Sequence, residues 1–214
     1  MIRIKVCGIT NIEDALAAQA LGADAIGMVF AKSPRRVEKE QAREIVQALP
    51  PFVHLVGVFV DEEKSVIEDI ADFCRLTVLQ FHGSESPEYC AGFGRLVIKA
   101  FRISQREDIE RLKPYQGKVS AFLLDTYHPV FAGGTGQAFD WDMAKEAGHA
   151  SGRFAGAKKI GPIILAGGLN PDNIGAAIRA VKPYAVDVSS GVEMSPGKKD
   201  HDKMRLFIER AQQA

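Results

Sequence analysis

The sequence contains no long hydrophobic run and no excess of charge of either sign. Among its 214 residues, 27 are Lys or Arg and 27 are Asp or Glu, so the formal net charge is zero with histidine neutral. A chain without a basic excess lacks the dominant basic face through which many proteins bind nucleic acid. No apolar run approaches the ~18 residues that a membrane span requires, and no apolar stretch with a cleavage site follows Arg3 and Lys5, so we expect no signal peptide. We therefore expect neither nucleic acid nor a membrane as a partner.

Cysteine is also scarce. The three cysteines, Cys7, Cys74 and Cys90, are an odd set without a Cys-x-x-Cys pair, which indicates neither a disulfide framework nor a zinc site. His54 and His82 likewise lack partners at the spacing of metal ligands, so we expect no metal ion. A reducing cytoplasm is the simplest location for such a chain. The 46% apolar and 25% charged residues are typical of a soluble globular protein and argue against disorder.

Short apolar runs alternate with segments of helical spacing along the chain. Runs rich in Val, Ile, Leu and Phe are typical of strands buried on both faces, and their alternation with helices indicates βαβ units and a parallel sheet. Eight such units favour a closed (βα)8 barrel, the TIM barrel fold, over an open doubly wound sheet. No linker is visible, so we expect a single α/β barrel domain over residues 1–214. The predicted strands are residues 3–7, 25–30, 54–60, 78–82, 96–101, 121–126, 162–166 and 185–189.

The helical segments carry their own boundary signals. Asn11 fits the N-cap of the first helix, and Gly22 fits the residue after its end. Asn170 followed by Pro171 predicts another helix start, because asparagine caps a helix and proline suits its first position. Small and basic residues at 148–159, in the widest gap between strands, predict a long surface loop or a frayed helix end. The further helical segments are residues 38–49, 61–73, 105–112, 170–181 and 200–212.

Polar residues stand where several predicted strands end. A (βα)8 barrel builds its active site at the carboxyl ends of its strands. Arg35 and Arg36 are either solvated surface residues or a source of a bidentate clamp for a carboxylate. His82 either hydrogen-bonds a ligand or anchors its loop. The strand-end candidates are Cys7, Asp61, His82, Arg102, Asp125, Ser189 and Ser190, with Arg35 in the loop after the second strand.

Cys7 and Asp125 have two interpretations each. Cys7 is either a small buried hydrophobe or a thiol whose pKa is lowered by N–H groups or cations. Asp125 closes an apolar strand, where a carboxylate is costly unless it is paired or protonated. It is either a cap or ion partner, or a general acid whose pKa burial raises, and its strand-end position favours the acid. If Cys7 faces the barrel interior, alternation places Lys5 there too, where it would form a buried pair with Asp187 of the last strand.

Glycine-rich turns follow the last three predicted strands. Glycine lets backbone N–H groups approach an anion closely, and the loops after the seventh and eighth strands of such barrels often hold a phosphate. The alternative is that these glycines only make tight turns. Their occurrence after both of those strands favours a phosphate site. The residues concerned are Gly133, Gly134, Gly167, Gly168, Ser189, Ser190 and Gly191.

Several longer strings occur together and in the order of one family. They are KVCGIT at 5–10, GADAIG at 22–27, VGVFV at 56–60, LQFHG at 79–83, LLDT at 123–126, GGTG at 133–136, AGGLNP at 166–171, VDVSSGVE at 186–193 and PGKKD at 196–200. The first and last strings are specific, and the middle ones are shared with other barrels. With this set the chain resembles the phosphoribosylanthranilate isomerases, (βα)8 barrels of tryptophan biosynthesis. The match runs nearly end to end and departs mainly at 148–159.

The resemblance implies an activity and a site. The family converts N-(5-phosphoribosyl)anthranilate to 1-(2-carboxyphenylamino)-1-deoxyribulose 5-phosphate, an Amadori rearrangement that requires no metal or organic cofactor. By resemblance, Asp125 is the general acid that opens the furanose ring, and Cys7 is the general base at C2′. Arg35, or its neighbour Arg36, is implied as the clamp for the anthranilate carboxylate. The implied partner is a small phosphorylated substrate, and the implied assembly is a monomer or homodimer. The turns that match the family's phosphate site contain Gly133, Gly134, Gly168, Ser190 and Gly191.

Two other functions stay open. Another phosphosugar barrel, such as an indole-glycerol-phosphate synthase or a sugar-phosphate isomerase or epimerase, would share the glycine turns. A synthase needs strand-end lysines and glutamates, and Lys99 in the fifth strand has no matching set of acids. A metal-dependent epimerase needs paired His and Asp ligands, which are not apparent. A non-catalytic barrel that binds a phosphorylated ligand would keep the turns but would not need both Cys7 and Asp125.

Overall fold

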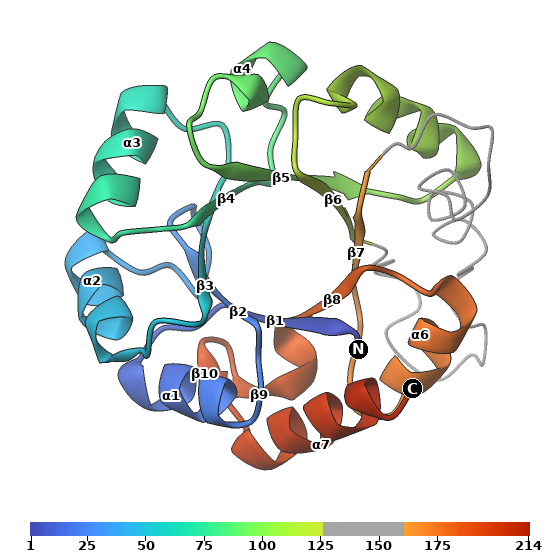
Figure 1. Cartoon of the computed structure of the whole chain (residues 1–214). Helices are drawn as coiled ribbons and strands as arrows, with labels where there is room; N and C mark the ends of the chain where they lie inside the picture. Colours follow the sequence, from blue (N-terminus) through green and yellow to red (C-terminus); the bar gives the residue numbers. More distant parts are fainter. Residues whose placement is uncertain (126–160) are drawn as a thin grey trace.

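Eight parallel strands close into a barrel in the computed structural model, which describes residues 1–125 and 161–214 (Figure 1). Each strand pairs with the next along the chain, and β8 pairs with β1, so the barrel is closed as predicted. Every strand begins and ends within one residue of its predicted run. That residues 1–214 form one domain stays a prediction. The strands are β1 (Arg3–Cys7), β2 (Ala25–Val29), β3 (His54–Phe59), β4 (Val78–Phe81), β5 (Leu96–Arg102), β6 (Ala121–Asp125), β7 (Ile163–Ala166) and β8 (Ala185–Val188).

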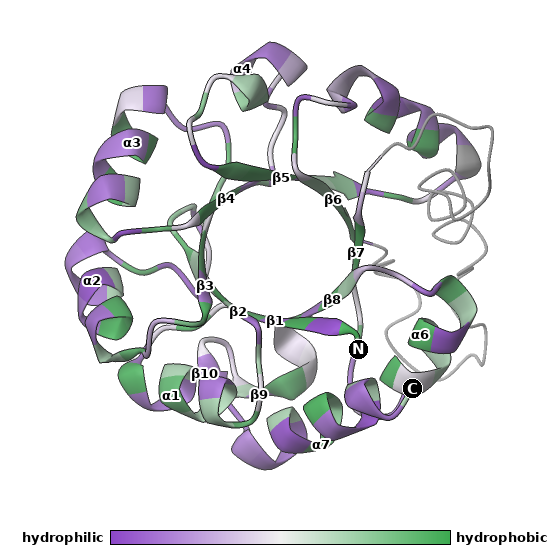
Figure 2. Ribbon diagram, in the orientation of Figure 1, coloured by the Kyte–Doolittle hydropathy of each residue, from purple (hydrophilic) through white to green (hydrophobic). Residues whose placement is uncertain are grey.

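Helices surround the barrel, between successive strands (Figure 1). Figure 2 shows mainly hydrophobic colour on the strands and mixed colour on the helices, which have one face toward the barrel and one toward solvent. An unpredicted hairpin of β9 (Glu193–Ser195) and β10 (Lys198–Lys199) follows β8. The helices are α1 (Ile12–Ala20), α2 (Lys39–Ala48), α3 (Lys64–Phe73), α4 (Pro87–Ala91), the 3-10 helix η1 (Arg106–Tyr115), α6 (Ile174–Val181), the 3-10 turn η3 (Ser190–Val192) and α7 (His201–Gln212).

The boundaries of α1 are those that its sequence predicts. The Asn11 side chain accepts a hydrogen bond from the backbone N–H of Asp14 over 2.8 Å, which is N-cap geometry. Gly22 follows the helix with a φ of +102°, a conformation that favours glycine. The cap and the glycine therefore set the length of this helix.

The predicted helix start at Asn170 is wrong, because α6 begins at Ile174. The Asn170 side chain accepts hydrogen bonds from the backbone N–H groups of Asp172 and Asn173, over 2.8 and 3.2 Å. Such local bonds offer the backbone a turn in place of a helix. Asn170 and Pro171 therefore mark a turn that precedes the helix.

Two further helical segments differ from prediction. The segment 61–73 becomes helical only at Lys64, because Asp61 has a φ of +49° and lies in a turn. The segment 105–112 forms η1, a 3-10 helix that extends to Tyr115 past Pro114. Proline has no backbone N–H to donate, which disfavours a regular α-helix there. The predicted loop at 148–159 lies outside the described residues.

The apolar core has two parts, one on each face of the barrel wall. Successive residues of a strand point to opposite faces. In β6, Phe122 and Leu124 belong to the cluster between the strands and the helices, whereas Leu123 belongs to a cluster that fills the barrel. Asp125 has the parity of Leu123, so it lies on the interior face at the carboxyl end of its strand. The alternation of side chains along each strand therefore determines which strand-end residues point into the barrel.

Candidate active site

Cys7 lies at the end of β1 next to a buried ion pair. The Lys5 ammonium donates a hydrogen bond to the Asp187 carboxylate over 2.8 Å, and the two side chains are 4% and 10% exposed. This confirms the predicted pair. A Cβ at Gly27 would come within 2.9 Å of the Cys7 sulfur and 3.1 Å of Lys5 Cε. Both side chains therefore lie against the bare backbone of β2.

The charges around Cys7 act on its thiol in opposite directions. Burial raises the pKa of Cys7, and the neighbouring Lys5 charge opposes that rise without cancelling it. For Lys5, burial alone would lower the pKa, but Asp187 and Cys7 together raise it. The resting site therefore holds a neutral thiol beside an ammonium, a cation of the kind that stabilises a thiolate.

Asp125 lies beside His82 at the same end of the barrel. The distance from His82 Nε2 to a carboxylate oxygen of Asp125 is 3.6 Å, and the side chains are 28% and 21% exposed. Asp125 is therefore half-buried, less enclosed than a strand-end carboxylate surrounded by apolar residues would be. Arg102 ends the neighbouring strand β5, paired in register with Asp125. Asp61 instead accepts a hydrogen bond from the backbone N–H of Ser84 over 2.6 Å, which joins the loops after β3 and β4.

The side chain of Arg35, in the loop after β2, lies against Gly8, the residue that follows Cys7. A Cβ at Gly8 would come within 2.6 Å of Arg35 Cδ and 3.0 Å of Ser189 Oγ, so the arginine stem crosses the backbone that follows Cys7. Arg36 instead forms an exposed ion pair with Glu38 over 3.2 Å. Of the two neighbouring arginines, Arg35 is the one that this geometry places at the strand ends.

The glycine loops after β7 and β8 approach each other closely. A Cβ at Gly191 would come within 1.9 Å of the Leu169 carbonyl oxygen, which no side chain tolerates. Gly167 and Gly168 have φ of +89° and +65°. Ser190 opens the short turn η3. The two backbones thus lie side by side, as a phosphate site made of N–H groups requires. Gly133 and Gly134 lie outside the described residues.

Glu193 and Lys199, on the hairpin after β8, are site neighbours that sequence reasoning missed. Arg35 donates two hydrogen bonds to the Glu193 carboxylate, from Nε over 2.8 Å and from Nη2 over 2.6 Å. The buried Lys199 ammonium donates to Glu193 over 2.9 Å and to the backbone oxygen of Cys7 over 2.7 Å. Burial lowers the pKa of Lys199. Both residues stand in the strings that carry the family resemblance, but no periodic pattern ties them to Arg35.

Lys99 does not face the barrel interior. It alternates with Ile98 and Ala100, which belong to the interior cluster, and its ammonium lies 3.2 Å from the buried Glu85 carboxylate. It also donates to the backbone oxygen of Gly83 over 2.8 Å. Lys99 therefore anchors the loop after β4 and does not offer the strand-end lysine that a synthase mechanism needs.

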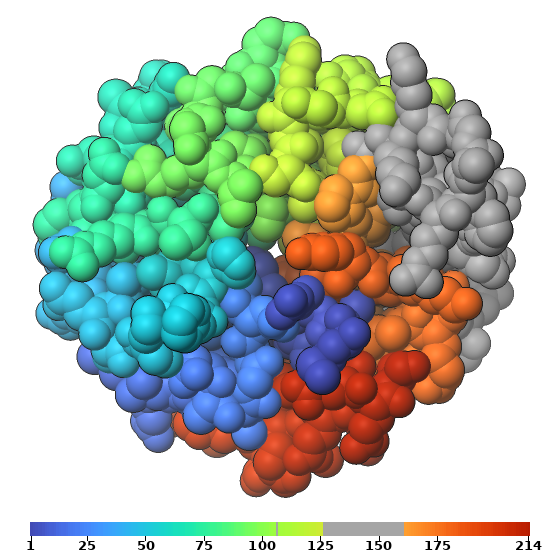
Figure 3. Space-filling view, viewed as in Figure 1, coloured from blue at the N-terminus to red at the C-terminus, as the bar shows by residue number. Residues whose placement is uncertain are grey.

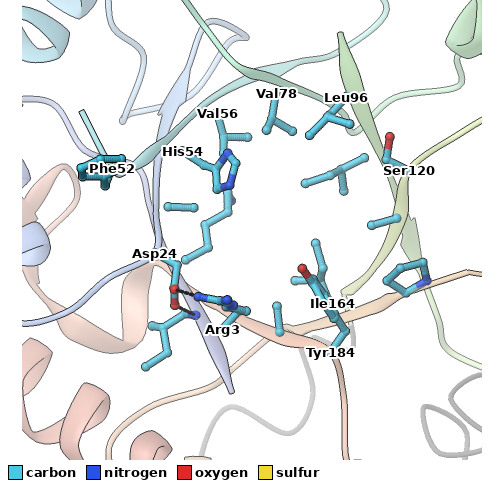
Figure 4. A pocket seen from close by; sticks show the side chains of 17 residues that line it. Arg3, Asp24, Phe52, His54, Val56, Val78, Leu96, Ser120, Ile164 and Tyr184 are labelled. Atoms are coloured by element: carbon cyan, nitrogen blue, oxygen red, sulfur yellow. Dashed lines mark hydrogen bonds and ion pairs between the residues drawn. The ribbon is translucent and has the colours of Figure 1, made fainter. Parts of the chain in front are cut away.

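Two cavities lie at opposite ends of the strands. One of about 630 Å³ lies beside the carboxyl ends of β4 and β5 and against η1, with His82, Arg102 and Tyr115 in its lining, and neither Cys7 nor Asp125 lines it. Another of about 350 Å³ opens at the opposite end, where Figure 3 shows a narrow central opening beside the N-terminal residues. Figure 4 shows this second opening, with the Arg3–Asp24 ion pair on one side. It lies away from Cys7 and Asp125.

No helix in residues 1–125 and 161–214 is both long and apolar enough to cross a bilayer. In the same part of the chain, no three His, Cys, Asp or Glu side chains gather as a metal site would require.

Comparisons with known proteins agree with one another. A family model described as N-(5'phosphoribosyl)anthranilate (PRA) isomerase matches residues 4–210. A protein of Pelobacter propionicus named N-(5'-phosphoribosyl)anthranilate isomerase is 52% identical over 214 residues, which are 100% of this chain and 97% of that protein.

Solved structures of such isomerases have the same barrel. One, in complex with reduced 1-(o-carboxyphenylamino)-1-deoxyribulose 5-phosphate, has a TM-score of 0.85 at 44% identity and covers 100% of both chains. A structure of monomers generated from the dimeric isomerase of Thermotoga maritima has a TM-score of 0.85 at 43% identity, again over 100% of both chains. The chain therefore belongs to the N-(5'-phosphoribosyl)anthranilate isomerase family.

Proposed function

We propose that this protein converts N-(5-phosphoribosyl)anthranilate to 1-(2-carboxyphenylamino)-1-deoxyribulose 5-phosphate, a step of tryptophan biosynthesis. The observation that carries the proposal is the placement of Cys7 and Asp125 on the interior face of the barrel, at the same end, in a chain similar to these isomerases over its whole length. A proton donor and a proton acceptor at one site are what an Amadori rearrangement requires. A cytoplasmic location, expected from the sequence, belongs to this proposal.

Asp125 acts first, as the general acid. Its carboxyl group gives a proton to the furanose ring oxygen while the C1′–O bond breaks, and the anthranilate nitrogen supplies the electron pair that forms the iminium. His82, at 3.6 Å from the carboxylate, orients Asp125 toward the ring. This step needs the acid to be protonated when substrate binds, which desolvation by the substrate favours.

Cys7 acts second, as the general base. The thiol first passes its own proton, through solvent, to the Asp125 carboxylate that the first step left behind. The resulting thiolate removes the proton from C2′, and the electron pair of that bond moves toward the iminium to form an enolamine. The enolamine then tautomerises to the aminoketone, and both Cys7 and Asp125 are again in their starting protonation states. Lys5 supports this step because an ammonium next to sulfur stabilises the thiolate.

The two ends of the substrate bind at different places. Arg35 binds the anthranilate carboxylate, for which a guanidinium offers bidentate geometry. The phosphate binds to backbone N–H groups of the loops after β7 and β8, with Gly133 and Gly134 contributing from outside the described residues. Asp187 supports the site indirectly, because its carboxylate accepts a hydrogen bond from Lys5, the residue next to Cys7 on the interior face of β1. The proposed phosphate loops contain Gly167, Gly168, Ser189, Ser190 and Gly191.

Turnover of freshly made substrate tests the function. Purified wild-type protein should consume phosphoribosylanthranilate, seen as a loss of anthranilate fluorescence, and Cys7→Ala and Asp125→Asn should each lower kcat by at least about a hundredfold. Cys90→Ala removes a buried thiol from the helical layer and should leave kcat unchanged. No turnover by the wild type would favour a non-catalytic phosphate-binding barrel. Turnover that survives in both site variants would refute the assigned roles.

For the assembly, we propose a homodimer formed through the N-terminal end of the barrel. Phe52 is 99% exposed and lies at the opening there, together with Leu96 and Tyr184, which are 52% and 59% exposed (Figure 4). Exposed apolar residues gathered around an opening are typical of an interaction surface. The Thermotoga maritima relative is described as dimeric. Light scattering tests the proposal: the wild type should have the mass of two chains and Phe52→Ser that of one, and a monomeric wild type would overturn it.

A further inference from the structure

The Arg35 guanidinium is held along one edge only. Nε and Nη2 donate to the two oxygens of Glu193, over 2.8 and 2.6 Å, which is a bidentate contact. A guanidinium carries five N–H donors in a planar fork. The contact with Glu193 uses two of them. Within residues 1–125 and 161–214, no side chain or backbone oxygen accepts a hydrogen bond from Nη1, and the Arg35 side chain is 22% exposed.

Glu193 is built into the protein more firmly than Arg35. Its side chain is 5% exposed, and besides Arg35 it accepts a hydrogen bond from the Lys199 ammonium over 2.9 Å. Lys199 is itself tied to the backbone oxygens of Cys7 and Ser189, over 2.7 and 3.2 Å. The carboxylate that holds Arg35 is therefore fixed relative to the ends of β1 and β8.

The three charges of this cluster leave one positive charge. Arg35 and Lys199 each carry a positive charge, and Glu193 carries one negative charge, which Lys199 already balances. Glu193 can therefore orient Arg35 without cancelling the attraction between the guanidinium and a further anion. A carboxylate on a substrate at the strand ends would meet a cation that is already in place.

We propose that Glu193 is a positioning residue, which fixes Arg35 by its Nε–Nη2 edge so that the remaining donors face the carboxylate of the anthranilate ring. The inference rests on the proposed function, in which Arg35 binds that carboxylate. Its physical basis is pre-organisation, because an arginine that is already ordered loses less side-chain entropy when it binds. Glu193 itself does not touch the substrate.

A pair of substrates that differ only in the carboxylate tests the proposal. Glu193→Gln and Glu193→Asp each weaken the two-point contact with Arg35, the first by removing the charge and the second by shortening the side chain. With phosphoribosylanthranilate, each variant should raise KM roughly five- to twentyfold, the loss of about one charge-assisted hydrogen bond, with a much smaller change of kcat. With the N-(5-phosphoribosyl) derivative of aniline, which lacks the carboxylate, wild type and both variants should have the same kcat/KM.

Three reference proteins separate the possible failures. Glu38→Gln weakens the exposed partner of the neighbouring Arg36 and should not change KM. No turnover by the wild type would refute the proposed function, and an unchanged KM in Arg35→Ala would refute Arg35 as the clamp. If Arg35→Ala raises KM but both Glu193 variants do not, or if they affect the aniline substrate equally, Glu193 does not position Arg35. Circular dichroism confirms folding, and the aspartate variant carries the test if the glutamine variant is unfolded.

Discussion

Replacement of Lys5 by methionine is expected to have a large effect on stability and on activity, because one side chain serves both. Methionine has a similar length and no charge. In Lys5→Met, the Asp187 carboxylate keeps its place in the barrel but loses the ammonium that lies 2.8 Å away. Cys7 loses the neighbouring cation that opposes the rise of its pKa.

The burial of the pair sets the expected loss of stability. Both side chains are at least nine-tenths buried, and removal of one partner from a buried ion pair costs about 3–5 kcal/mol, because it leaves an unpaired charge in a medium of low polarity. The pKa of Lys5 is raised in the folded protein despite its burial, because Asp187 and Cys7 outweigh that burial. A raised pKa means that the stabilisation is fully present below the pKa of an unfolded lysine and is lost as pH rises through the folded value. The effect of Lys5→Met should therefore be at its full size at neutral pH.

Urea denaturation of matched variants measures this loss. Lys5→Met should lower the free energy of unfolding by about 3–5 kcal/mol, and the double variant Lys5→Met/Asp187→Asn should recover part of it, because no unpaired charge remains. Lys39→Met serves as the control: Lys39 forms an ion pair of similar length with Asp69, over 2.7 Å, but on the surface. Lys39→Met should change the midpoint urea concentration of unfolding little. If Lys5→Met behaves like the control, or if the double variant is no more stable than the single one, the buried pair does not have the role assigned to it.

Three other outcomes follow from the same geometry. In the plot of kcat/KM against pH, the rising limb should occur at higher pH than the pKa of an ordinary thiol, because burial raises the pKa of Cys7. In Lys5→Met this limb should move to still higher pH. A limb that does not move would show that Lys5 does not act on the thiol. At neutral pH, Lys5→Met should lower kcat/KM by about tenfold for each unit by which the thiol pKa rises, measured by the fluorescence assay. Gly191→Ala should weaken competitive inhibition by inorganic phosphate and raise KM, because its Cβ would come within 1.9 Å of the Leu169 oxygen and force the loops after β7 and β8 apart; unchanged inhibition would place the phosphate elsewhere.

The regular parts of the molecule were predictable because they repeat. Strands buried on both faces are continuous apolar runs, so their bounds could be placed within one residue. Alternation along β1 and β8 was also sufficient to predict that Lys5 meets Asp187, two residues that are 182 positions apart. The start of α6 was not predictable from Asn170 and Pro171, because the same asparagine side chain serves equally well in a helix cap and in a turn.

The contact between Arg35 and Glu193 shows where such prediction ends. Arg35 lies in the irregular loop after β2. Glu193 lies 158 residues further along the chain, on the short hairpin of β9 and β10 that follows β8. Neither segment has a periodic sequence pattern that predicts which way its side chains point. Arginine and glutamate are also common on protein surfaces, so neither residue type suggests the contact. Only the folded barrel, which brings the ends of β1, β2 and β8 together, makes them partners.

The zero net charge of the chain conceals an arrangement of charges at the strand ends. Lys5 and Asp187 compensate each other, so they give Cys7 a local cation without adding net charge to the site. Glu193 compensates Lys199 and leaves Arg35 with one positive charge for one carboxylate. A substrate that carries a carboxylate and a phosphate then needs another source of attraction for the phosphate, and in the proposed binding mode backbone N–H groups of the loops after β7 and β8 supply it without further charge. Selectivity for such a substrate would therefore depend on where each partner lies, and an anion that reaches only one of the two places would bind weakly.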